Sequence, residues 1–132
     1  MSFSYPLASL VSKLNFASKR KLFLIYVPFT NFNLSVLKVL YTEGVINAFV
    51  IRKSNIVVYL KYLNNKSVFK SLKVVSRPGK RKFSNLVALQ RYQASMYLSG
   101  FYIISTSKGI LSSSQSLFMF ENVGELLIKV DL

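Results

Sequence analysis

The segment Phe101-Tyr102-Ile103-Ile104-Ser105-Thr106-Ser107-Lys108-Gly109 joins an apolar run to a short polar tip. Its first four residues are aromatic or β-branched, a composition typical of a buried strand. The next five residues supply three hydroxyls, one ammonium group and a glycine, whose backbone adopts angles that other residues avoid. We therefore expect a strand that ends in a polar loop, and this loop can lie against a sugar-phosphate surface, a substrate or water.

The charge of the chain indicates a polyanionic partner. The 132 residues include 18 Lys and Arg and four acids, so the net charge is 18 − 4 = +14. Such a charge destabilises a compact chain through self-repulsion unless a polyanion neutralises it. Nucleic acid or an anionic membrane surface is the expected partner, and the length allows one compact unit or two small lobes.

The composition also excludes several kinds of chemistry. The chain contains neither Cys nor His, which removes disulfides, thiolate sites, the commonest metal ligand and the commonest general base. We therefore expect no enzyme, no metal and no cofactor. The longest apolar run, Leu22 to Phe29, has eight residues and contains Pro28, whereas a bilayer span needs about 20. We expect no membrane insertion.

Hydrophobic periodicity predicts an αβαβββ lobe in residues 1–76. Apolar residues at helical spacing predict a helix over 5–18, and a β-rich run predicts a strand over 22–27, which Pro28 ends. The other predicted elements are a helix that starts at Asn31 or Asn33 and ends at Gly44, and strands over 45–51, 56–62 and 68–75.

The turn signal Ser76-Arg77-Pro78-Gly79 and the charge cluster after it mark the predicted lobe boundary. Residues 77–132 are predicted to form a mixed, β-rich lobe with a short helix. The whole chain is thus predicted to be an α+β protein of two small lobes. The elements expected in the second lobe are helices over 86–98 and 112–120, strands over 101–105 and 126–130, and an irregular or strand segment over 109–111.

Several segments, in this order, resemble the bacterial and organellar form of the small-subunit ribosomal protein eight family. The resemblance extends from about residue 5 to the end of the chain. It departs from the family pattern at Tyr5 and Ser9, where acidic residues are usual, and at Asn15-Phe16-Ala17, which replaces an arginine-asparagine-glycine run. The segments that carry it are Pro6-Leu7-Ala8, Glu43-Gly44, Ser76-Arg77-Pro78-Gly79, Ser105-Thr106-Ser107-Lys108-Gly109 and Gly124-Glu125.

The resemblance implies a structural constituent of the small ribosomal subunit. Such a protein binds the central domain of small-subunit ribosomal RNA, supports assembly of that domain, contacts neighbouring ribosomal proteins and takes no small-molecule substrate. Phe, Tyr, Ile, Asn and Lys occupy 49 of 132 positions, which indicates an AT-rich gene. We expect the protein in the mitochondrial ribosome, ahead of a plastid or the bacterial cytoplasm.

The hydroxyl loop is the main RNA-binding site that the resemblance implies. Ser105 and Ser107 are expected to hydrogen-bond ribose or base edges, and Thr106 is expected to orient the loop. Lys108 is expected to pair with a phosphate, and Gly109 is expected to permit close approach of the backbone.

Two further groups complete the predicted site. Arg77, Lys80 and Arg81 are expected to contact phosphates, although a run of cations is often only a solvated surface. Gly124 and Glu125 are expected to support the hydroxyl loop from the last strand, Glu125 through its backbone or through hydroxyls.

Two alternatives belong to other functional classes. Ser105 and Lys108 match the Ser-x-x-Lys pattern of a serine nucleophile with a lysine base, but the chain lacks Ser-Asp-Asn and Lys-Thr-Gly elements. A basic protein on an anionic membrane surface requires a helix with one cationic face, and the second predicted helix carries only Lys38. No aromatic pair has the sequence spacing of a surface platform for stacking bases.

Overall fold

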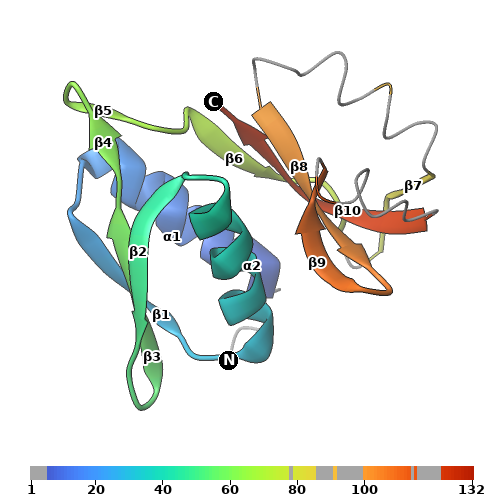
Figure 1. Cartoon of the computed structure of the whole chain (residues 1–132), viewed down its shortest axis with the longest axis horizontal. Coiled ribbons are helices and arrows are strands. Elements are labelled where there is room, and N and C mark those ends of the chain that lie inside the picture. Colours follow the sequence, from blue (N-terminus) through green and yellow to red (C-terminus); the bar gives the residue numbers. More distant parts are fainter. Residues whose placement is uncertain (1–5, 78, 86–90, 92–99, 114, 116–122) are drawn as a thin grey trace. The chain divides into compact units, whose positions relative to one another are not determined.

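The computed structural model describes residues 6–77, 79–85, 91, 100–113, 115 and 123–132, and Figure 1 shows its helices and strands. The contacts within the chain divide it into unit 1, residues 1–70, and unit 2, residues 71–132. Two helices and several antiparallel sheets confirm the predicted α+β class.

Unit 1 is a three-stranded antiparallel sheet with two helices. The strand order is β1-β3-β2, so β3, the last of the three in the sequence, lies in the centre. Helix α1 contacts β1, α2 contacts β2, and the helices contact each other. Their buried leucines pack with the buried residues of the sheet, as predicted from the helical spacing. The elements are α1 (Pro6–Arg20), β1 (Leu24–Pro28), α2 (Asn31–Thr42), β2 (Ile46–Ile51) and β3 (Asn55–Leu60).

Helix α2 has a different N-cap from the predicted one. Thr30, not Asn31 or Asn33, occupies the cap position, and its hydroxyl accepts a hydrogen bond from the Asn33 N–H at 3.0 Å. The predicted end at Gly44 is confirmed: this glycine has φ of 78°, and the next N–H, from Val45, donates to the Leu40 carbonyl at 2.9 Å. This is the hydrogen bond of a Schellman motif.

The chain between α1 and β1 is held by Tyr62. The Tyr62 hydroxyl donates to the Leu22 carbonyl at 2.6 Å and lies 3.3 Å from the Ala17 carbonyl. Partial burial raises the pKa of Tyr62 above its usual value. These contacts fix the residues that lead into β1, including Phe23.

A small hairpin, β4 (Tyr62–Leu63) and β5 (Lys66–Ser67), was not predicted. Asn64 and Asn65 join the two strands with φ of 52° and 63°. Positive φ at both central residues is the requirement of a type I′ turn, and asparagine tolerates it better than most residues. The Asn-Asn pair was therefore an available signal for this hairpin.

Unit 2 is a five-stranded sheet built around the last strand. The path β6-β10-β8-β9 is hydrogen-bonded in that order, and β7 pairs with another part of β10. The register between β10 and β8 shifts at a bulge between Leu126 and Ile128 of β10. The elements are β6 (Ser71–Val74), β7 (Phe83–Asn85), β8 (Gly100–Thr106), β9 (Gly109–Ser112) and β10 (Val123–Asp131).

Only part of the segment predicted as a strand over 68–75 forms one, namely β6, which belongs to unit 2 and pairs with β10. The contacts divide the chain between Lys70 and Ser71, whereas the predicted boundary is at residue 76. The helix predicted over 86–98 lies, apart from Arg91, outside the described residues. Most of the helix predicted over 112–120 does so too.

Candidate nucleic-acid interface

The five residues of the predicted hydroxyl loop form the tip of the β8–β9 hairpin. Thr106 pairs with Gly109 across the two strands, and Ser105 pairs with Ile110. Ser107 and Lys108 therefore form a two-residue turn. The side chains of Ser107 and Lys108 are exposed, while Ser105 and Thr106 are half-buried.

Thr106 holds this turn closed. Its hydroxyl donates to the Gly109 carbonyl at 2.9 Å and accepts a hydrogen bond from the Lys108 N–H at 3.2 Å. A single side chain thus ties both ends of the turn together. The Thr106 hydroxyl therefore bonds within the turn, and its role in orienting the loop toward RNA stays a prediction.

Gly109 combines an unusual backbone with open space. Its φ is 109°, a conformation that side-chain-bearing residues rarely adopt, and a Cβ atom added there would meet nothing within 4 Å. Glycine is therefore required by the backbone and not by crowding. The open space also leaves room for another molecule to approach the turn.

Gly124 lies directly behind the hairpin. A Cβ atom at this position would lie 2.3 Å from Cγ2 of Ile104 and 3.2 Å from Cγ2 of Thr106. Any side chain would therefore push β10 away from the residues at the base of the turn. Glycine is therefore required here by crowding, and a role of Gly124 in supporting an RNA-binding loop stays a prediction.

Glu125 supports two segments at once. Its backbone pairs with Ser105 in the β10–β8 register. Its carboxylate, however, is directed to the basic segment: Oε2 accepts hydrogen bonds from the Ser76 hydroxyl and from Nη1 of Arg81, the latter at 3.0 Å. The Ser76 hydroxyl, which is fully buried, also accepts from the Lys82 N–H at 3.2 Å. Glu125 therefore anchors the Ser76–Lys82 segment to β10.

The pKa of Glu125 reflects these contacts. Partial burial raises this pKa, but the hydrogen bond from Ser76, the hydrogen bond from Arg81 and the positive charge of Arg81 lower it by more. The net result is a pKa below the usual glutamate value, so the carboxylate is charged at neutral pH.

The three predicted phosphate contacts differ in their surroundings. Arg77 and Lys80 are exposed and close a turn through two backbone hydrogen bonds, in which the Lys80 N–H donates to the Arg77 carbonyl at 2.8 Å and the reverse bond is 3.2 Å long. Arg81 forms an ion pair with Glu125, and half of its side chain is exposed. An RNA contact by Arg81 stays a prediction, in addition to this structural role.

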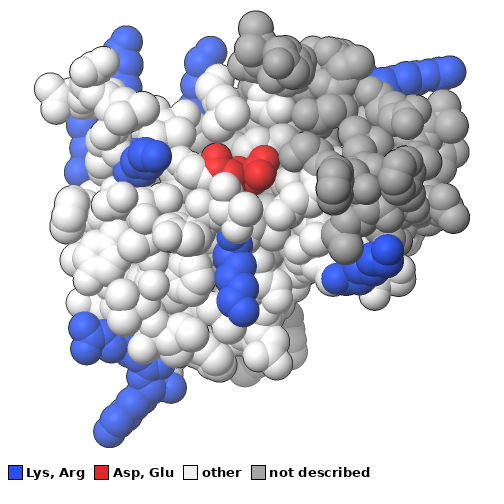
Figure 2. Space-filling view, in the orientation of Figure 1, with Lys and Arg blue, Asp and Glu red and all other residues white. Residues whose placement is uncertain are grey.

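Basic side chains are widely spread over the surface. Figure 2 shows Lys and Arg on several sides of the visible face, whereas acidic atoms are confined to one small area. Among the described acids, Glu125 pairs with Arg81, and Asp131 lies 3.8 Å from Lys73 and 3.9 Å from Lys129. The two described carboxylates on unit 2 thus have cationic neighbours. With 18 Lys and Arg against four acids, most of the positive charge of the chain has no carboxylate to balance it.

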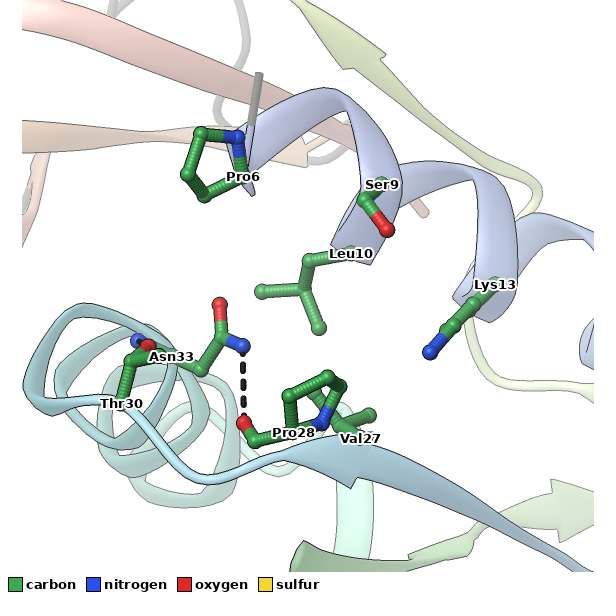
Figure 3. Close-up of a pocket in the computed structure, with 8 residues that line it drawn as sticks. All are labelled: Pro6, Ser9, Leu10, Lys13, Val27, Pro28, Thr30 and Asn33. Carbon is green, nitrogen blue, oxygen red and sulfur yellow. Dashed lines mark hydrogen bonds between the residues drawn. The ribbon is translucent and has the colours of Figure 1, made fainter. Parts of the chain in front are cut away.

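A second candidate site, in unit 1, was missed by sequence reasoning. It is a cavity of about 140 Å³ whose lining comes from α1, the end of β1 and the start of α2. Figure 3 shows the Asn33 amide within it: the nitrogen donates to the Pro28 carbonyl at 3.0 Å. Asn33 Oδ1 is buried and has no hydrogen-bond partner in the described part of the chain, so it can accept from a small donor group. The lining residues are Pro6, Ser9, Leu10, Lys13, Val27, Pro28, Thr30 and Asn33.

Within the described residues, no group of three or more Asp, Glu, His or Cys side chains is placed to hold a metal ion. None of the described helices is long and apolar enough to cross a membrane. Together, the α+β fold of the chain, the basic surface and the hydroxyl-bearing hairpin have the features of a small nucleic-acid-binding protein.

Comparison with known proteins identifies the family to which the chain belongs. A family model described as Ribosomal protein S8 matches residues 5–130, nearly the whole chain. The chain belongs to the ribosomal protein S8 family, as its sequence motifs predicted. Members of this family are structural components of the ribosome, which confirms a structural ribosomal role without enzyme activity.

Individual relatives cover most of the chain. The small ribosomal subunit protein uS8m of Acanthamoeba castellanii is 41% identical over 99 residues, which are 74% of this chain and 76% of the relative. The uS8 proteins of Anaplasma phagocytophilum and Orientia tsutsugamushi are 34% and 35% identical and cover 88% and 98% of this chain, or 90% and 99% of their own lengths. The similarity to a uS8m protein supports the predicted location in a mitochondrial ribosome.

Proposed function

We propose that this protein binds the central domain of small-subunit ribosomal RNA and supports the assembly of that domain beside neighbouring ribosomal proteins. The observation that carries the proposal is the turn at the tip of the β8–β9 hairpin. Thr106 fixes this turn through two hydrogen bonds, and the turn presents Ser107 and Lys108 to the outside. A binding surface that is already ordered loses little conformational entropy when it binds.

The chemistry of the tip suits an RNA helix. An A-form helix presents ribose 2′-hydroxyls and base edges in a wide, shallow groove, where short hydroxyl side chains can donate and accept hydrogen bonds. Ser105 and Ser107 take this role, Lys108 neutralises a phosphate, and the space beside Gly109 admits the sugar-phosphate backbone. The RNA-binding lobe in this proposal is residues 77–132.

The basic segment adds charge next to the tip. Glu125 holds Ser76 and Arg81 while its backbone pairs with Ser105, so the segment and the hydroxyl loop share one support. Arg77 and Lys80, both exposed on this segment, then provide further phosphate contacts.

Replacing Ser105 and Ser107 together by alanine is expected to weaken binding to a central-domain rRNA helix by about 1 to 3 kcal/mol, because hydrogen bonds buried on binding are lost. Binding to a random duplex of equal length should change much less, since it depends mainly on charge. Filter binding or fluorescence anisotropy at fixed salt measures both. The matched control is Ser12→Ala with Ser54→Ala, two exposed serines of unit 1. Equal losses on both RNAs would contradict specific recognition by the tip.

Lys108→Ala is expected to reduce the slope of log K against log salt by about 0.7 to 0.9 for the same helix, because one fewer counterion is released. Lys38→Ala removes the same charge from an exposed position on α2 and should leave the slope nearly unchanged. Titrations at several salt concentrations give both slopes. A slope that does not respond to Lys108→Ala would remove this residue from the phosphate contacts.

A further inference from the structure

The face of the β1-β3-β2 sheet opposite the helices is apolar and open. Val27, Ile56 and Val58 are buried on the helix side, and Phe49 on the same side packs its ring edge-to-face against Tyr41 of α2. Because side chains alternate along a strand, the neighbours of these residues point the other way. Tyr26 and Val50 are such neighbours, and they are 61% and 41% exposed.

Strand register places two aromatic rings on this face, those of Tyr26 and Tyr59, and a ring contact adds a third, that of Phe23. Tyr26 and Val50 lie opposite Val57 from its two sides, and Leu24 lies opposite Tyr59. Phe23, which is 66% exposed, meets the Tyr59 ring edge-to-face with centroids 6.0 Å apart. We call this surface the outer sheet face; it comprises Phe23, Leu24, Tyr26, Ala48, Val50, Val57 and Tyr59.

Strand pairing adds a relation that spacing along the chain does not show. The expectation about aromatic pairs considered spacing along the chain, but antiparallel pairing of β1 with β3 places Tyr26 and Tyr59 on adjacent strands, with Tyr26 opposite Val57. Side chains in this diagonal relation lie about 7 to 8 Å apart at their backbones, within reach of aromatic rings.

Cations lie at both ends of the outer sheet face. The Leu60 N–H donates to the Phe23 carbonyl, so the chain just before Phe23, with exposed Lys21, lies at one end. Exposed Arg52 and Lys53, in the β2–β3 turn, lie at the other. Residues 1–70 contain ten Lys and Arg but one carboxylate, Glu43, and this residue caps α2 on the helix side of the sheet.

We infer that the outer sheet face is a stacking platform for unpaired bases of RNA. Aromatic rings on a cationic surface are the combination that binds single-stranded nucleic acid, because the bases stack on the rings and the cations follow the backbone. A second copy of the chain would bring like charges together. The inference rests on the proposed function in that the partner is RNA, but it assigns unit 1 a site separate from the hairpin tip.

The test separates aromatic stacking from general apolar contact. In the double variant Tyr26→Leu/Tyr59→Leu, leucine side chains keep the face apolar, but two aromatic rings are lost. In Tyr26→Phe/Tyr59→Phe both rings remain. Tyr41→Leu is the matched control, since Tyr41 is 54% exposed but lies on α2, on the other side of the sheet. Thermal melting of each variant establishes that it is folded.

Fluorescence anisotropy of the full chain with an unpaired eight-nucleotide RNA gives the dissociation constants. The leucine double variant is expected to bind about 5- to 100-fold more weakly, whereas the phenylalanine double variant and Tyr41→Leu should bind like the unchanged protein. All variants should bind the central-domain helix within about twofold. The double alanine variant of Ser105 and Ser107 should show the reverse pattern.

Two results would overturn the inference and leave the proposed function intact. One is unchanged binding of the unpaired RNA by a folded leucine double variant that still binds the helix. The other is incorporation into small subunits that fails for this variant although its RNA affinities are unchanged, which would assign the face to a neighbouring protein. Failure of the serine variant alone to lose helix binding would instead overturn the proposed function.

Discussion

Gly100→Ala is expected to destabilise unit 2 strongly. Gly100 has φ of 152°, and a Cβ atom there would lie 2.0 Å from the Val130 carbonyl oxygen and 3.1 Å from the carbonyl carbon. These are backbone atoms of the strand that pairs with β8, so no rotation of a side chain relieves the overlap. Backbone strain of about 1 to 3 kcal/mol and overpacking of about 1 to 3 kcal/mol add to a loss of about 2 to 6 kcal/mol.

Urea unfolding followed by circular dichroism measures this loss as a lower midpoint. Gly109→Ala is the matched control, because its φ is also positive, at 109°, but its Cβ would meet nothing within 4 Å. This control is expected to lose only the cost of the left-handed backbone, about 1 to 2 kcal/mol. If the two variants lost the same stability, the overlap with the Val130 carbonyl would make no contribution to the loss.

Glu125→Ala is expected to lower the free energy of unfolding by about 1.5 to 3 kcal/mol at neutral pH. The buried Ser76 hydroxyl and the Arg81 guanidinium would both lose their acceptor. The Ser76–Lys82 segment would then be held to β10 chiefly by the hydrogen bond from the Leu126 N–H to the Lys82 carbonyl. Urea unfolding at pH 7 gives the difference, and Arg81→Ala, which leaves the bond from Ser76 in place, should cost less.

The same carboxylate predicts a dependence of stability on pH. The pKa of Glu125 is lower in the folded protein than its ordinary value of 4.5, so the unfolded chain binds the proton more readily. The contribution of Glu125 is therefore complete above 4.5 and is lost as the pH falls through the lowered folded-state pKa. Glu125→Gln should reduce the acid dependence of the urea midpoint in this range. An identical dependence in both proteins would contradict the lowered pKa.

Local patterns in the sequence predicted most of unit 1. The spacing of Leu7, Leu10 and Leu14 predicts α1, and Glu43-Gly44 predicts the end of α2; the structure confirms both. These signals depend on neighbours within a few residues, because a helix forms its hydrogen bonds along its own segment. The N-cap was missed because Thr30, Asn31 and Asn33 can all cap a helix, and only the backbone angles of Thr30 select it.

Unit 2 was harder to predict because its contacts join distant parts of the sequence. The alternation of side chains in β6 predicted a strand, but it does not show which strand is the partner. β6 pairs with β10, so it belongs to unit 2 and not to the first lobe. The hydroxyl loop was found because its residues are contiguous. The hydrogen-bond partners of Glu125 were not found from the sequence, since Ser76 is 49 residues away and other hydroxyl side chains were equal candidates.

The outer sheet face shows the same limit for a binding surface. The sequence contains many aromatic residues, and most of them at such spacing fill a core. Only the register between β1 and β3 shows that Tyr26 and Tyr59 share the side of the sheet that the helices leave uncovered.

The central place of β10 in unit 2 has a consequence for synthesis. β6, β7 and β8 all pair with β10, yet β10 follows every one of them in the chain. During translation these strands emerge before the strand that pairs with all three, and β8 has only β9 as a described partner until β10 follows. Unit 1 takes its whole sheet from β1, β2 and β3 and does not have to wait for that residue. The growing chain therefore acquires the outer sheet face first and the support of the hydroxyl loop last.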